Sequence, residues 1–179
     1  MKYTNKVLAI ILSGIMIFAA GCQKKESASL LPFGLEFGAV YEEIQKANDI
    51  GDLKDSQSNA GYVTNLKYIS KEEEIIEIIG TSDGVSDVAI MLAFNAEKKL
   101  YEFYCIFTLE NDKVAEINDV IKQKYNKVAG EEEEESNGIA LWKNEKYVID
   151  YRCTEPYGAV LGEDVQYVIA IHSNELDFE

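Results

Sequence analysis

Three cysteines and a single histidine are among the residues of this 179-residue chain whose side chains could act as nucleophiles or metal ligands. Each would need partners at a defined spacing, either a base and an orienting acid or several further ligands. His172 has no His-Glu-x-x-His motif around it, and the chain contains no Cys-x-x-Cys pair. We therefore expect no catalytic residue, no metal and no cofactor, and we expect His172 to lie at the surface.

Acidic residues are abundant, with 32 Asp and Glu, so some pair of carboxylates could lie at the separation that a glycosidase uses. Nothing in the sequence singles out one pair, and a cell-wall-directed hydrolase is therefore the alternative to a non-catalytic protein. Residues Glu131 to Glu135 form a run of like charges, which repel one another and stay hydrated. The run lacks the interleaved turn residues of a calcium loop, so we expect a surface loop.

The first 22 residues contain the parts of an export signal. Lys2 and Lys6 lie in a polar start, an apolar run extends from Val7 to Ala20, and Cys22 follows Gly21. The run is shorter than the roughly 20 apolar residues that span a bilayer. The sequence Ala19-Ala20-Gly21-Cys22 resembles the lipobox of bacterial lipoproteins, with alanine where that family most often has leucine.

This resemblance implies that residues 1–21 are removed and that the Cys22 thiol carries a diacylglyceryl group. Burial of acyl chains stabilises an anchor by about 0.8 kcal/mol per CH₂. The implied location is the cell membrane, where the protein is lipid-anchored on the extracytoplasmic face. Residues 22–31 would be a polar tether, and residues 32–179 would form a single domain.

The net charge is consistent with this predicted location. Loss of residues 1–21 removes two lysines and no acidic residue, so the formal charge changes from −15 to −17. Such a surface argues against nucleic acid as a partner and against electrostatic docking on anionic lipid. The partners that we expect are the membrane, through Cys22, and another protein of the envelope.

The other two cysteines, Cys105 and Cys153, both lie within predicted strands. Outside the membrane an even pair suggests a disulfide. Burial of two reduced thiols as small apolar side chains is equally physical, and the sequence leaves both alternatives open.

The elements that would position these residues follow from hydrophobic periodicity. An extended or short strand entry at residues 33–37 precedes an amphipathic helix at 40–47, and β-rich segments follow at 62–69 and 74–79, the second also readable as a helical turn. Residues 88–94 and 100–109 predict a hairpin whose strands are apolar on both faces, so we expect helices on each side. A helix capped by Asn111 follows over 111–125, and strands follow at 139–142, 147–154 and 165–173.

Short turns between successive strands indicate antiparallel pairing. The predicted fold class is therefore α+β, with a single antiparallel sheet of about six to seven strands and two main helices packed on it.

Aromatic residues could provide a partner-binding surface. Trp142, Tyr147 and Tyr151 lie on two neighbouring predicted strands, and tyrosine and tryptophan dominate binding hot spots. We predict these three as partner-binding residues, with ordinary core packing as the alternative.

Residues Phe37-Gly38 and Tyr41-Glu42-Glu43-Ile44 add a second resemblance. A glycine followed by a tyrosine-glutamate helix start is similar to that of small envelope lipoproteins with an N-terminal helical segment and an antiparallel sheet. These include the lipoprotein subunit of the outer-membrane barrel-assembly machine and the secreted β-lactamase-inhibitor proteins. The resemblance implies a non-enzymatic domain that binds another protein.

Overall fold

The structure is a computed structural model that describes residues 30–46, 54–57, 63–130, 139–154 and 165–176. Cys22, the predicted signal, residues 22–29 of the predicted tether and the run Glu131 to Glu135 lie outside the described residues. The described chain forms one antiparallel sheet with three helices, which confirms the predicted α+β class.

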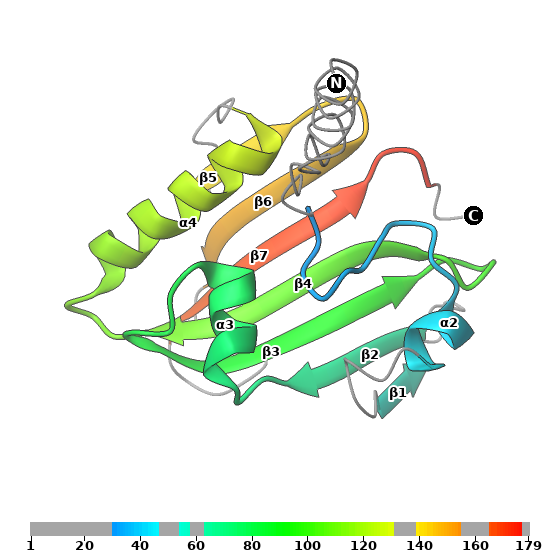
Figure 1. Cartoon of the computed structure of the whole chain (residues 1–179), viewed down its shortest axis with the longest axis horizontal. Coiled ribbons are helices and arrows are strands. Elements are labelled where there is room, and N and C mark those ends of the chain that lie inside the picture. Colours follow the sequence, from blue (N-terminus) through cyan, green and yellow to red (C-terminus); the bar gives the residue numbers. More distant parts are fainter. Residues whose placement is uncertain (1–29, 47–53, 58–62, 131–138, 155–164, 177–179) are drawn as a thin grey trace, which may run out of the picture.

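The sheet has seven described strands in the order β1-β2-β3-β4-β7-β6-β5, and every neighbouring pair is antiparallel (Figure 1). The strand β7 returns to the centre of the sheet, between β4 and β6. The bounds are β1 (Lys54–Gln57), β2 (Val63–Tyr68), β3 (Val85–Phe94), β4 (Leu100–Leu109), β5 (Ala140–Lys143), β6 (Tyr147–Thr154) and β7 (Gln166–Ser173). Six of the seven match predicted segments, and the polar β1 gave no period-2 signal that could reveal it.

The β3–β4 hairpin is confirmed, and its turn is built around Asn95. The Asn95 Oδ1 atom accepts hydrogen bonds from the backbone N–H groups of Glu97 (3.1 Å) and Lys99 (3.0 Å). These contacts satisfy turn amides that would otherwise have no partner inside the loop. The turn therefore fixes the register in which β3 and β4 pair.

All three described helices pack on one face of the sheet (Figure 1). They are α2 (Tyr41–Lys46), α3 (Glu72–Ile79) and α4 (Val114–Ala129). Their buried side chains join the inward residues of β3, β4, β6 and β7 in one core, and the Tyr41 ring meets the Phe94 ring edge-on at 5.2 Å. The expectation of helices on both faces of the hairpin is wrong for the described helices.

The opposite face carries a second, smaller apolar cluster. Ile106, Val168 and Ala170 are buried there, with Tyr104 packed against them. The apolar pattern on both faces of the hairpin therefore predicted burial correctly, but burial on this face does not come from a described helix.

The segment predicted as a strand at 74–79 is the helix α3, so only its helical interpretation is correct. Ile75, Ile78 and Ile79 fall at helical spacing and pack into the core, while most of the glutamates between and before them are exposed. Gly80 ends the helix in a left-handed conformation with φ +103°, and its N–H donates to the Ile76 carbonyl at 2.8 Å. This αL ending is typical of glycine after a helix.

Two further boundaries differ from the prediction. The helix α4 begins at Val114 after Lys113 and has no side-chain cap, so the proposed Asn111 cap is wrong, although Ile117, Ile121 and Tyr125 form the expected buried stripe. Residues 33–37 do not form a strand, because Phe33 has φ +60° and Gly34 has φ +64°, which bend the chain. The predicted helix at 40–47 is confirmed as the shorter α2.

Candidate functional site

The three aromatic residues predicted to bind a partner do lie close to one another, but beneath α4. Trp142 and Tyr151 are fully buried, and Tyr147 is half-buried. Core packing, the alternative to a binding surface, therefore describes Trp142 and Tyr151. Their side chains point to the helix-bearing face because they alternate with outward residues along β5 and β6.

Each of these aromatic residues donates a hydrogen bond to α4. The Trp142 Nε1 atom donates to Asn126 Oδ1 at 2.6 Å, and the Tyr151 hydroxyl donates to Asn118 Oδ1 at 2.5 Å. The Tyr147 hydroxyl donates to the Val128 carbonyl at 3.3 Å. The polar tips are thus satisfied within the domain, as buried tyrosine and tryptophan require.

The predicted disulfide alternative is wrong, because Cys105 and Cys153 are not bridged. Cys105 lies on β4 and Cys153 on β6, and β7 separates these two strands. Neighbouring strands lie about 4.8 Å apart, so the two backbones are nearly 10 Å apart, beyond the roughly 7 Å that a disulfide allows. Cys105 is fully buried and burial raises the pKa of its thiol, so it packs as a small apolar side chain.

One motif carries chemistry that the residues considered above do not. Residues Gly80-Thr81-Ser82-Asp83-Gly84 match the Gly-x-Ser-x-Gly spacing of a hydrolase nucleophile. In that motif the serine lies between a strand and a helix, whereas here the loop leaves the helix α3 and enters the strand β3. The Ser82 hydroxyl donates to Glu72 Oε1 at 3.1 Å. A catalytic serine of this kind instead donates to a histidine that an acidic residue orients.

His172 is also too far away to activate Ser82. His172 pairs with Glu102 in the register of β4 and β7, and the loop containing Ser82 meets the other end of β4, where the Glu110 N–H donates to the Gly84 carbonyl. Glu102 and Glu110 are eight residues apart along an extended chain, which corresponds to a distance of about 27 Å. Ser82 and His172 therefore do not form a catalytic pair.

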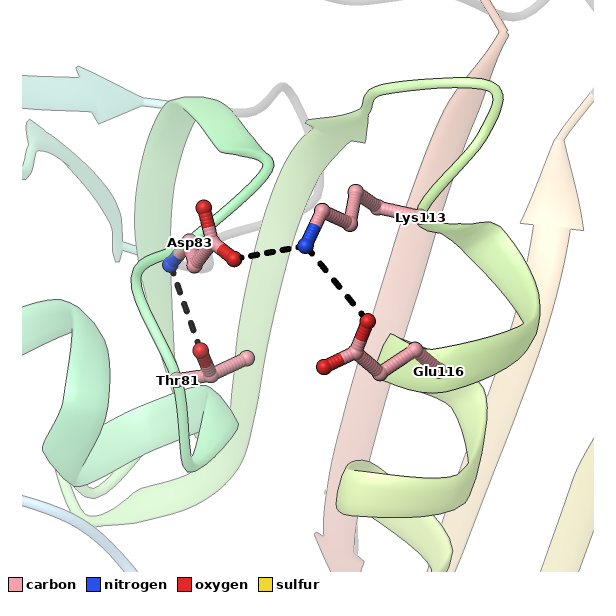
Figure 2. Close-up of polar contacts among 4 residues, drawn as sticks. All are labelled: Thr81, Asp83, Lys113 and Glu116. Atoms are coloured by element: carbon pink, nitrogen blue, oxygen red, sulfur yellow. Dashed lines mark hydrogen bonds and ion pairs between the residues drawn. The ribbon is translucent and has the colours of Figure 1, made fainter.

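The same loop is held against the start of α4 by polar contacts (Figure 2). The Lys113 Nζ atom lies 2.8 Å from Asp83 Oδ2 and 3.5 Å from Glu116 Oε2, and the Asp83 N–H donates to the Thr81 hydroxyl at 3.2 Å. The hydrogen bond to Asp83 is the main cause that raises the pKa of Lys113. These groups are largely exposed, so the contacts orient the loop and add little stability.

A cleft of about 440 Å³ lies between the end of α3 and the second half of α4. The α3 side contributes Glu77 and Gly80. The α4 side contributes Val120, Gln123, Lys124, Lys127 and Val128. This cleft combines apolar walls with a few charged groups, as small-molecule sites do.

Lys124 is the central polar residue of the cleft. Its Nζ atom donates to the Glu77 carbonyl, and the Tyr125 hydroxyl donates to the Ile78 carbonyl at 3.2 Å. With Gly80 bonded to Ile76, these contacts satisfy carbonyl groups that the end of a helix leaves without intrahelical partners. A cation at this end also interacts favourably with the helix dipole.

Burial lowers the pKa of Lys124 to about 8, against opposing effects of the Glu77 carboxylate and the Cys105 thiol. The residue nevertheless keeps part of its surface in contact with solvent, with its ammonium 5.7 Å from the centre of the Tyr125 ring. Sequence reasoning missed Lys124, although a lysine three residues after Ile121 and next to Tyr125 borders the apolar stripe and is a recognisable signal.

The pKa of Lys124 predicts a pH-dependent stability. Between pH 8 and about 10.5 the unfolded chain keeps the lysine proton and the folded protein has released it, so the free energy of unfolding rises with pH. Lys124→Met should abolish this contribution, and its stability relative to the wild type should therefore fall as pH rises from 7 to 10. Urea unfolding at several pH values measures the difference.

Lys143→Met is the matched control for that experiment, because Lys143 is an exposed lysine on β5 away from the cleft. Its difference from the wild type should change little over the same range. A constant difference for Lys124→Met as well would contradict the prediction.

The alternative function is a hydrolase that uses a pair of carboxylates. The lining of this cleft contains one carboxylate, that of Glu77. Among the described residues there is no cluster of His, Cys, Asp and Glu side chains that could hold a metal ion. In the same ranges, no helix has the length and apolarity needed to cross a bilayer.

Comparisons with protein-family models, with curated proteins and with solved structures found no significant match to this chain.

Proposed function

We propose that this chain is a lipid-anchored protein of the bacterial envelope, held on the extracytoplasmic face by Cys22, whose α+β domain is a non-catalytic binding module. The observation that carries the proposal is the export signal that ends at Gly21-Cys22. The −17 charge after removal of residues 1–21 leaves the lipid as the means of membrane attachment.

The start of the folded domain supports the same proposal. Leu31 is only 2% exposed and belongs to the core, so the tether is limited to residues 22–30. At about 3.3–3.6 Å per residue, a segment of this length can span at most roughly 30 Å. The Phe33 N–H donates to Glu77 Oε1 at 2.5 Å, so the tether joins the domain on its helix-bearing side.

A partner would find an exposed aromatic side chain on the other face of the sheet. Tyr68 in β2 is 64% exposed, and it pairs with Ala89, whose side chain lies on the face opposite the helices. An exposed tyrosine provides contact area at low entropic cost. We place the contact with an envelope protein at Tyr68, instead of at Trp142 or Tyr151.

Cys22→Ala tests the anchor. The wild-type protein should fractionate with membranes and carry the mass of a diacylglyceryl group. The Cys22→Ala protein should lack that mass, and any of it whose signal is cleaved at another site should leave the membrane fraction. Mass spectrometry and membrane fractionation measure both. Persistence of Cys22→Ala in salt-washed membranes after signal removal would refute lipid anchoring.

The same membranes test the binding part of the proposal. A photoreactive phenylalanine in place of Tyr68 should cross-link the lipidated protein to a discrete envelope protein, and the same residue in place of exposed Lys143 should not. Equal cross-linking at both positions, or none at Tyr68, would argue against a partner at this face.

A further inference from the structure

The cleft between α3 and α4 is lined by more lysines than carboxylates, on a chain with a formal net charge of −15. Its ionisable lining residues are Glu77, Lys124 and Lys127, which together carry one net positive charge. Two lysines against one carboxylate in the lining allow the cleft to pair with an anionic group. A ligand with one negative charge fits this lining better than a ligand with two, because the Glu77 carboxylate would repel a dianion more strongly.

The shape and chemistry of the walls narrow the ligand further. Val120 and Val128 provide apolar surface, Gln123 provides an amide, and the volume of about 440 Å³ falls in the range of small-molecule sites. A molecule with one carboxylate and a short apolar part would pair with the lysines and cover the two valines.

Lys124 has donor capacity for such a ligand. An ammonium group has three N–H donors, and the Glu77 carbonyl accepts one of them. The ammonium is partly removed from water between the two helices, and burial disfavours its charged form. A bound carboxylate would compensate for that loss of hydration by accepting N–H groups of the ammonium that the Glu77 carbonyl does not accept.

We propose that this cleft binds the carboxylate group of a small, partly apolar molecule, with Lys124 donating hydrogen bonds to the carboxylate and Lys127 adding its charge. The carboxylate could belong to a free acid or to the C-terminus of a peptide. This inference goes beyond the envelope-binding proposal and does not depend on the anchor or on Tyr68.

The test uses the whole lipidated chain in detergent, with isotope-labelled valine methyl groups observed by NMR. Hexanoate represents a free acid and N-acetylvaline represents a peptide C-terminus. Hexanamide and N-acetylvalinamide are their uncharged controls. We expect saturable shifts of the Val120 and Val128 methyl signals with one or both carboxylates and not with the amides. Binding of only one carboxylate identifies the source.

Lys124→Met should weaken the carboxylate affinity about ten- to hundredfold, as expected for loss of one charge-assisted hydrogen bond. Lys143→Met removes the same charge outside the cleft and should leave the affinity unchanged. Methyl signals away from α3 and α4 report whether each variant is folded. The proposal is overturned if neither carboxylate shifts the two valines, or if folded Lys124→Met binds as tightly as the wild type.

Discussion

Replacement of Trp142 by alanine should lower the free energy of unfolding by about 3–5 kcal/mol, the range for a fully buried large aromatic residue. Trp142 is 0% exposed on the edge strand β5, and its ring lies 5.6 Å from that of Tyr125 in α4. Its removal would leave a cavity exactly where α4 is held on the sheet, so the change should affect the whole domain. Chemical unfolding followed by far-ultraviolet circular dichroism measures it, since the chain has no other tryptophan for fluorescence.

Asn126→Ala separates the packing of Trp142 from its hydrogen bond. It removes the acceptor at 2.6 Å from the indole nitrogen and leaves the ring in place, and it should cost about 1–3 kcal/mol, because the indole N–H is left unsatisfied. Trp142→Phe should lie between the two variants. If Trp142→Ala were no more destabilising than Asn126→Ala, the ring would not contribute to the core in the way described here.

Gly84→Ala should destabilise the domain by about 2–5 kcal/mol. Gly84 has φ +72°, which costs about 1–2 kcal/mol for a residue with a Cβ atom. A Cβ atom there would also lie 2.8 Å from Lys113 Cβ and Cγ, and overpacking of this kind costs about 1–3 kcal/mol. The Lys113 Cβ atom is fixed by its backbone, so the start of α4 must shift. Urea unfolding measures the loss of stability.

Gly34→Ala is the matched control, because Gly34 has a similar φ of +64° and a Cβ atom there would meet nothing within 4 Å. Gly34→Ala should therefore lower the free energy of unfolding only by the cost of a positive φ in a residue with a Cβ atom. Equal losses for the two variants would mean that the close approach between Gly84 and Lys113 contributes nothing.

Much of the fold could be predicted from local patterns. The hairpin from Val85 to Leu109, the stripe of α4 and the strands β5, β6 and β7 all have strong periodicity, and short connections require antiparallel pairing. The helix α3 was ambiguous because its segment is short and contains only isoleucine and glutamate, so β-branched content and helical spacing gave opposite indications. The polar β1 lacked any pattern.

The candidate site could be predicted only in part. The grouping of Trp142, Tyr147 and Tyr151 followed from their strands, but the side on which they are covered depends on where α4 crosses the sheet. The separation of Cys105 from Cys153 depends on β7 entering between β4 and β6. Lys124 became a candidate only when the end of α3 was found beside it.

The sequence by itself determined the charge and the alternation of apolar residues, and it predicts the N-terminal signal, because these depend on residue type and spacing along the chain. The tertiary structure alone decided which face the helices cover, which strands are neighbours and which lysine lies in a cleft. The physical reason is that a period-2 strand specifies two faces without specifying what packs on either. Contacts between residues 47 positions apart, such as Lys124 with Glu77, exist only after the chain has folded.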